Sequence, residues 1–155
     1  MPEIEYVTMA NHAEAINGLL YLQGAGWTDV RTSEGPDGNL STIHLGIGLS
    51  ILVGWNETNT SYPLDFALLH EDGGDPILAG QGQIEAGRPP GVPPGGDLRS
   101  VIAIGADVVF PRPGGYEFRA TLDGKTKSVS FRVNQPAPPP RPAGPIGPAS
   151  IPGIS

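Results

Sequence analysis

Apolar and polar residues alternate along most of the chain, and a helical period of 3.6 residues is sustained nowhere. The clearest stretch is 43–53, where apolar residues at the odd positions share one face. The other face of the same stretch carries Gly46, Gly48 and Ser50. Successive side chains of a strand point to opposite faces of its sheet. The pattern therefore predicts a long strand with one face buried in a core.

Similar alternation recurs on both sides of this strand. It covers residues 4–9, 14–22, 64–68, 76–86, 102–110, 116–122 and 129–133. Asn17-Gly18 divides the second of these stretches and predicts a hairpin, because a type I′ turn needs positive φ at both central residues. About eight strands, with turn signals at intervals of roughly 8–12 residues, predict an all-β fold. We expect an antiparallel β-sandwich, immunoglobulin-like or related, over residues 1–135.

Two features near the end of this domain predict local structure. Asp123-Gly124 predicts a tight turn between the last two strands. Tyr116 follows Pro113-Gly114-Gly115, and an aromatic residue just after such a turn commonly anchors a corner of a β-sandwich. We therefore expect a structural role for Tyr116.

The last twenty residues, 136–155, form a separate segment. It holds eight of the chain's 18 prolines. Five of them recur every third residue, which is the period of a polyproline II helix: Pro136, Pro139, Pro142, Pro145 and Pro148. The segment predicts an extended tail that packs into no core. It would serve either as a solubilising spacer or as a strap on a neighbouring subunit, with Pro139, Pro142, Pro145, Ile146, Ile151 and Ile154 as contact residues.

Composition removes several classes of function. The chain has 155 residues and no cysteine, which excludes disulfides, cysteine metal sites and cysteine nucleophiles. The net charge of −7 argues against non-specific nucleic-acid binding. Residues 1–87 hold twelve acidic residues and one arginine, whereas residues 88–155 hold eight basic and four acidic residues. This asymmetry is compatible with internal charge balance or with head-to-tail association.

The start of the chain has neither the positive segment nor the apolar run of a secretory signal. No stretch reaches the roughly 20 apolar residues of a membrane span. We therefore expect a cytoplasmic protein without a membrane span.

Candidate catalytic chemistry is sparse. The three histidines, His12, His44 and His70, have no spacing that requires them to converge, and no motif of a serine nucleophile or a nucleotide-binding loop is present. Residues 71–75 hold three carboxylates, but they lack the ligand spacing of a calcium loop and read as a turn. We expect no catalytic residues, no metal and no cofactor.

Two segments suit binding better. Trp55, Asn56, Glu57 and Tyr62 combine aromatic, amide and carboxylate groups, which with Trp27 would suit a sugar or another small ligand. Both tryptophans would equally serve to cap the core. The face of Gly46, Gly48 and Ser50 would admit a partner's backbone, or a covering loop of the same chain such as 88–96.

The body of the chain resembles a family of small, uncharacterised bacterial proteins, frequent in actinobacteria and known only as a domain of unknown function. The resemblance spans about residues 4–133. It is carried by the segments at 18–27, 55–59, 87–91 and 110–116, and the tail lies outside it. The resemblance implies a compact β domain in a bacterial cytoplasm, and it implies no activity.

These observations favour a non-enzymatic structural or interaction subunit. It would associate with itself as a homo-oligomer or dock onto a larger protein complex, with the tail as a strap. The alternative is a small-ligand or carbohydrate-binding module that uses the Trp55 segment. A third option is an enzyme whose acid and base are too dispersed along the sequence to recognise, and it requires a pocket in which a histidine meets a carboxylate.

Overall fold

The computed structural model describes residues 2–33 and 40–134. This part of the chain is built almost wholly of strands and turns and contains no α-helix, so the predicted all-β class is confirmed. Its elements are β1 (Glu3–Ala10), β2 (His12–Ile16), β3 (Leu19–Gln23), β4 (Asp29–Arg31), β5 (Thr42–Val53), the 3-10 turn η1 (Trp55–Glu57), β6 (Ser61–His70), β7 (Leu78–Glu85), β8 (Leu98–Val109), β9 (Gly114–Leu122) and β10 (Lys125–Asn134).

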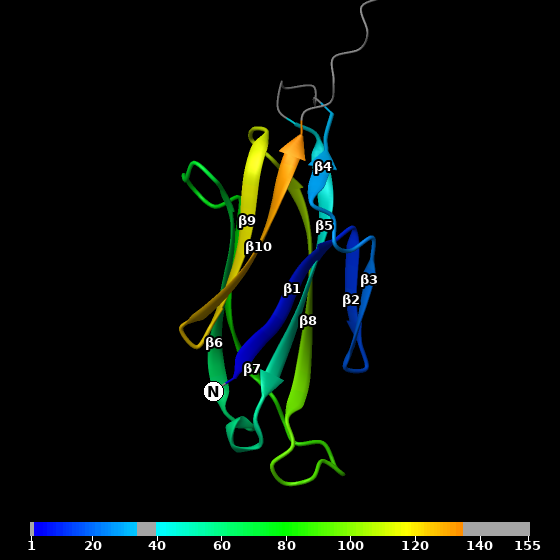
Figure 1. The fold of residues 1–155 in the computed structure, drawn as a ribbon, viewed down its shortest axis with the longest axis vertical. Coiled ribbons are helices and arrows are strands. Elements are labelled where there is room, and N and C mark those ends of the chain that lie inside the picture. Colours follow the sequence, from blue (N-terminus) through cyan, green and yellow to red (C-terminus); the bar gives the residue numbers. More distant parts are fainter. Residues whose placement is uncertain (1, 34–39, 135–155) are drawn as a thin grey trace, which may run out of the picture.

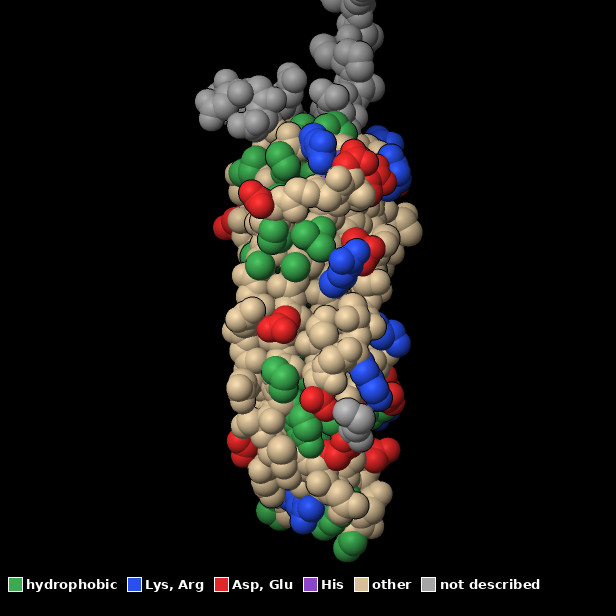
Figure 2. Space-filling model, turned by 90° about the vertical axis from the view of Figure 1, so that its left-hand side faces the viewer, with side chains coloured by type: hydrophobic (Ala, Val, Ile, Leu, Met, Phe, Trp, Pro, Cys, Tyr) green, Lys and Arg blue, Asp and Glu red, His purple; other side chains and the backbone are tan. Residues whose placement is uncertain are grey.

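The strands form two larger sheets that face each other, with a hairpin beside them (Figure 1). One sheet has the order β1-β5-β8, and the other has the order β4-β10-β9-β6-β7. A single cluster of buried apolar side chains draws on both sheets, so the core lies between them. The described part of the molecule is elongated along the strand direction (Figure 2).

The core follows from the alternation in the sequence. Leu45, Ile47, Leu49 and Ile51 of β5 are fully buried, and so is Phe118 of β9 in the facing sheet. Burying one such side chain stabilises the fold by roughly 1.5–3 kcal/mol. The prediction that the odd positions of 43–53 face a core is confirmed.

Both predicted turns are present. Asn17 and Gly18 have φ values of 51° and 76°, and Asp123 and Gly124 have φ values of 48° and 83°. The Tyr116 hydroxyl donates a hydrogen bond of 2.6 Å to the carbonyl oxygen of Arg112. Tyr116 is buried, and this bond ties the β8–β9 connection to the start of β9, so its predicted structural role is confirmed.

The hairpin predicted for 14–22 forms, but it joins neither main sheet. Strands β2 and β3 pair only with each other in the described chain and lie on the outer face of β5 and β8 as a third layer (Figure 1). After this hairpin the chain passes from the sheet of β1 to the other sheet. It enters there as β4, which runs parallel to β10, with Val30 opposite Val133.

Two details differ from the expected antiparallel sandwich of about eight strands: the described residues form ten strands, and β4 pairs parallel to β10. The finer assignment to an immunoglobulin-like type stays a prediction. In residues 2–33 and 40–134, no helix has the length and apolar character needed to cross a membrane. The predicted tail, 136–155, lies outside the described residues.

Candidate interaction surfaces

The Trp55 segment is a closed turn. Residues 55–57 form η1 directly after β5, and the Glu57 carboxylate accepts a hydrogen bond of 2.9 Å from the backbone N–H of Gly54. The Arg88 guanidinium carbon lies 3.9 Å from the centroid of the Trp55 ring. Arg88 also donates to the Trp55 carbonyl at 2.7 Å and to the Thr58 hydroxyl at 2.6 Å. One face of the Trp55 ring is thus occupied by this chain's own arginine.

The structure does not gather the five predicted ligand residues into one site. Trp27 lies two residues before β4, and β4 is in the half of the molecule away from the β5–β6 connection that holds η1 (Figure 1). The Trp27 ring packs edge-on against Phe131, with 5.1 Å between centroids, and its Nε1 is buried without a hydrogen-bond partner among the described residues. Tyr62 packs against the core, and Asn56 is exposed beside Trp55. Trp27 therefore caps the core, which is the role predicted from the sequence as the alternative to ligand binding.

The face of Gly46, Gly48 and Ser50 is covered by this chain's own hairpin. A Cβ on Gly46 would lie 2.6 Å from the backbone nitrogen of Ala13. A Cβ on Gly48 would lie 2.9 Å from Cδ2 of both Leu20 and Leu22. The prediction that this face receives a partner is therefore wrong, and so is the suggestion that residues 88–96 cover it. The missing side chains make room for β2 and β3.

The third residue of this set has a separate role. Ser50 donates a hydrogen bond of 2.9 Å to the Glu5 carboxylate, which also accepts two bonds of 2.9 Å from Arg99. The hydrogen bonds from Arg99 first, and from Ser50 second, lower the pKa of Glu5 to about 2. These three residues join β1, β5 and β8 at one end of the three-stranded sheet.

Two histidines that the spacing left unrelated come together. The rings of His12 on β2 and His44 on β5 stack with 5.9 Å between centroids. The Nε2 atom of His12 lies 2.9 Å from Glu14, and Nδ1 of His44 lies 2.8 Å from Asp107. All four side chains are substantially exposed. No sequence signal could reveal this pair, because it depends on where the hairpin docks.

The third histidine is structural. His70 is buried at the end of β6, with its ring edge-on to Tyr116 at 4.9 Å. The Asp72 N–H donates to its Nδ1 at 3.1 Å, and Nε2 lies 3.2 Å from the Pro113 carbonyl oxygen. In the part of the chain that the structure describes, no three His, Asp or Glu residues are placed to hold a metal ion together.

Two hollows lie near β4. One, of about 550 Å³, lies beside Trp27, Arg31 and His44. The other, of about 430 Å³, lies beside Asp29, Glu71 and Arg132 on the strands of the five-stranded sheet. Neither contains the Trp55 segment. His44 and Asp29 both line the first hollow, whereas Asp107 does not.

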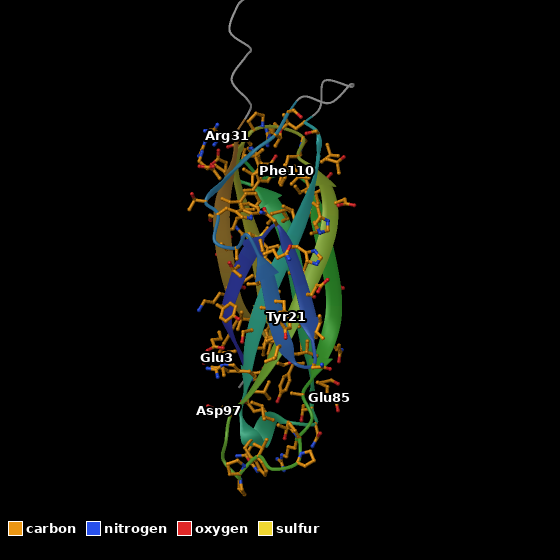
Figure 3. The ribbon with its side chains drawn as sticks, turned by 90° about the vertical axis from the view of Figure 1, so that its right-hand side faces the viewer. Glu3, Tyr21, Arg31, Glu85, Asp97 and Phe110 are labelled. Carbon is orange, nitrogen blue, oxygen red and sulfur yellow. The ribbon has the colours of Figure 1, made fainter. Side chains whose placement is uncertain are left out.

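The hairpin carries the main group of exposed apolar side chains. Leu20 and Leu22 point inward, so the alternate residues of β3 point outward. Leu19 is 60% exposed, Tyr21 is 52% exposed and Ile16 on β2 is 47% exposed. Ile16 lies directly opposite Leu19 in the hairpin register, and Tyr21 lies in the middle of this face in Figure 3. We call Ile16, Leu19 and Tyr21 the hairpin patch.

The outer face of the five-stranded sheet is different. Figure 2 shows its apolar side chains in small separate groups among polar and charged ones. The predicted partner-binding residues of the tail, Pro139, Pro142, Pro145, Ile146, Ile151 and Ile154, lie outside the described residues. The hairpin patch is therefore the apolar surface that the described chain offers most openly.

The chain belongs to DUF6941, a family of unknown function whose model matches residues 5–134. The match covers the β domain and stops where the proline-rich segment begins. The predicted resemblance to a domain of unknown function is confirmed. No curated protein matches the chain.

Proposed function

We propose that this member of DUF6941 is a non-enzymatic interaction subunit, which associates with itself or docks onto a larger protein complex, with residues 136–155 as a strap. The hairpin patch carries this proposal. The hairpin presents Ile16, Leu19 and Tyr21 to solvent. Exposed apolar and aromatic side chains of this kind are typical of surfaces that bind a protein partner.

The hairpin forms a two-stranded sheet of its own beside the two larger sheets. Its inner face, with Ala13, Leu20 and Leu22, is docked against glycines of β5. Its outer face makes no contribution to the core cluster. Aromatic and large aliphatic side chains held on a rigid, docked hairpin lose little conformational freedom when a partner covers them.

The non-enzymatic part of the proposal rests on exposure. The two close histidine–carboxylate pairs, His12–Glu14 and His44–Asp107, lie open to solvent, where water screens them. A general acid or base is usually held within a pocket that shapes its protonation.

The first test is the native mass of the full chain and of residues 1–135, by light scattering after size exclusion at low and high salt. We expect a mass above 16.1 kDa for the full chain and a smaller assembly after removal of the tail. Monomers under all four conditions would contradict self-association. Docking onto a larger complex would then stand only if the full chain, but not residues 1–135, bound a protein of its host.

A pair of variants tests the hairpin patch itself. Leu19→Ser with Tyr21→Ser removes apolar surface without touching the inward Leu20 and Leu22, so we expect a loss of association and unchanged folding. Gln81→Ser with Gln83→Ser, on exposed positions of β7, is the matched control. Equal association of both double variants and the wild type would remove the hairpin patch from the proposal.

The alternative of a small-ligand module at the Trp55 segment predicts a different result. The chain would be monomeric, and its tryptophan fluorescence would respond to a sugar or another small ligand. Because Arg88 covers one face of Trp55, such a ligand would have to displace Arg88 or use the opposite face. A fluorescence titration with simple sugars at millimolar concentration distinguishes the two functions.

A further inference from the structure

Strand β8 is a long sheet edge whose far side is unpaired in the described chain. It is hydrogen-bonded only to β5 in the order β1-β5-β8. The β5–β8 register runs without a shift from Thr42 opposite Val109 to Val53 opposite Leu98. The backbone groups on the far side of such a regular edge strand are free to pair with another strand.

The other sheet edges carry the features by which proteins block unwanted pairing. The register of β1 shifts between Ile4 and Tyr6, β4 has only three residues, and β7 has eight residues against the twelve of β8. Strand β8 has no proline, no lysine and no shift in register over twelve residues. Of the edge strands in the two larger sheets of the described fold, β8 is the longest.

The side chains of β8 are also incompletely covered. Ile102, Ile104 and Ala106 face the core, yet each is only partly buried, because the sheet stops at β8. A further strand beside β8 would cover the outer flank of these residues. The added strand would therefore bury apolar surface as well as complete backbone hydrogen bonds.

We infer that β8 pairs antiparallel with β8 of a second copy of this chain, about a two-fold axis at Ala103. The inference rests on the self-association arm of the proposed function and adds to the hairpin patch a second surface, the free edge of β8. The partner follows from the charges of β8. Arg99 and Asp107 are its charged residues, they lie on the same face, and they are equally distant from Ala103.

In the register centred on Ala103, Arg99 lies opposite the partner's Asp107, and Ile102 lies opposite the partner's Ile104. If the two-fold axis lay four residues away, at residue 99 or at residue 107, Arg99 would lie opposite the partner's Arg99, or Asp107 opposite the partner's Asp107. Cross-strand pairs of like charge are destabilising and pairs of opposite charge are stabilising. Among these three registers, the charges of β8 thus favour the one centred on Ala103, and a two-fold pairing closes after two chains.

The surroundings of the two charges suit this arrangement. The Arg99 side chain is 65% exposed and the Asp107 side chain is 71% exposed, so both remain available. Each already has a partner in its own chain, Glu5 for Arg99 and His44 for Asp107. Pairing would join these into an alternating network of Glu5, Arg99, the partner's Asp107 and the partner's His44, and such networks are worth more than isolated surface pairs.

Cysteine cross-linking of the full chain tests the register. Because the chain has no cysteine, Ala103→Cys introduces one thiol, which the axis would place opposite its symmetry mate. Directly opposed residues of antiparallel strands have Cα atoms about 4.5–5.5 Å apart, within the range for a disulfide. We expect a disulfide dimer on mild oxidation of A103C, and none for A79C, which carries its thiol on the exposed edge strand β7.

Charge exchange tests the same register without a covalent bond. In R99D alone, or in D107R alone, the homodimer would carry like charges at both contacts, and we expect its dissociation constant to rise about tenfold or more. An equimolar mixture of R99D and D107R would restore opposite charges at both contacts and regain the dimer. Changes within each chain are the same in the mixture and in the separate variants, so they cannot imitate this recovery.

Circular dichroism first establishes that each variant folds. Cross-linking of A103C together with recovery in the mixture supports the β8 pairing. If the wild type associates but A103C stays uncross-linked and the mixture behaves like its components, the β8 pairing is overturned and self-association stands. If the wild type is monomeric at every concentration reached, both are overturned.

Discussion

The docking of the hairpin makes a sharp prediction for Gly46→Ala. The added Cβ would lie 2.6 Å from the Ala13 nitrogen, 2.6 Å from the His12 carbonyl carbon and 2.8 Å from the His12 Cα. All three atoms are backbone, so no side-chain rotation relieves the overlap. The hairpin must move away from β5. Overpacking of this kind lowers the free energy of unfolding by about 1–3 kcal/mol.

Gly105 supplies the matched control. It lies directly opposite Gly46 on β8 and has the same substitution available. A Cβ there would meet only the His44 ring, at 3.7 Å, which is ordinary contact. Replacing a strand glycine by alanine without overlap removes freedom from the unfolded chain and stabilises by about 0.4–1 kcal/mol. The two variants should therefore change stability in opposite directions.

Denaturation in urea, followed by circular dichroism, measures both changes against the wild type. Amide hydrogen exchange then locates the damage, which should be confined in G46A to β2, β3 and their contacts with β5. A G46A variant as stable as G105A, with normal protection in β2 and β3, would show that the hairpin does not rest on β5 as described.

Two further predictions follow from individual hydrogen bonds. Tyr116→Phe removes the 2.6 Å bond to the Arg112 carbonyl and should lower the free energy of unfolding by about 0.5–1.5 kcal/mol in the same titration, whereas an unchanged midpoint would mean that water replaces the bond fully. The bonds from Arg99 and Ser50 lower the pKa of Glu5 to about 2, below the ordinary 4.5, so the ionised Glu5 stabilises the fold above pH 4.5 and this contribution is lost as the pH falls toward 2. The stability gap between the wild type and Glu5→Gln should thus close over that interval, and a gap independent of pH would contradict the assignment.

The sequence predicted the features that depend on neighbouring residues. Asn17-Gly18 specifies its own positive φ values, and the odd positions of 43–53 specify which face of β5 is buried. Tyr116 needs only the carbonyl of Arg112, four residues earlier, to form its corner. Each of these outcomes depends on local backbone preference or on the period of the pattern.

The placement of separate segments could not be predicted in this way. The glycines at 46 and 48 correctly predicted that another segment packs closely on this face of β5. Their spacing does not identify that segment, which is the hairpin of β2 and β3. The same docking brings His12 to His44. Trp27 and Trp55 each follow a glycine in the sequence, yet the fold packs Trp27 against Phe131 and Trp55 against Arg88. Long-range packing decides such pairings, and the local pattern of a single sequence does not reveal which segments pack together.

The position of β10 has a mechanical consequence. It is an interior strand, paired with β9 on one side and β4 on the other, and the proline-rich segment follows directly after it. Tension on that segment along the strand axis would load the hydrogen bonds on both flanks of β10 in shear, so that they would have to fail together rather than one after another. On an edge strand the same pull would be resisted from a single flank. A strap that starts from β10 would thus be anchored in a strand that β9 holds along most of its length and β4 holds at its last three residues.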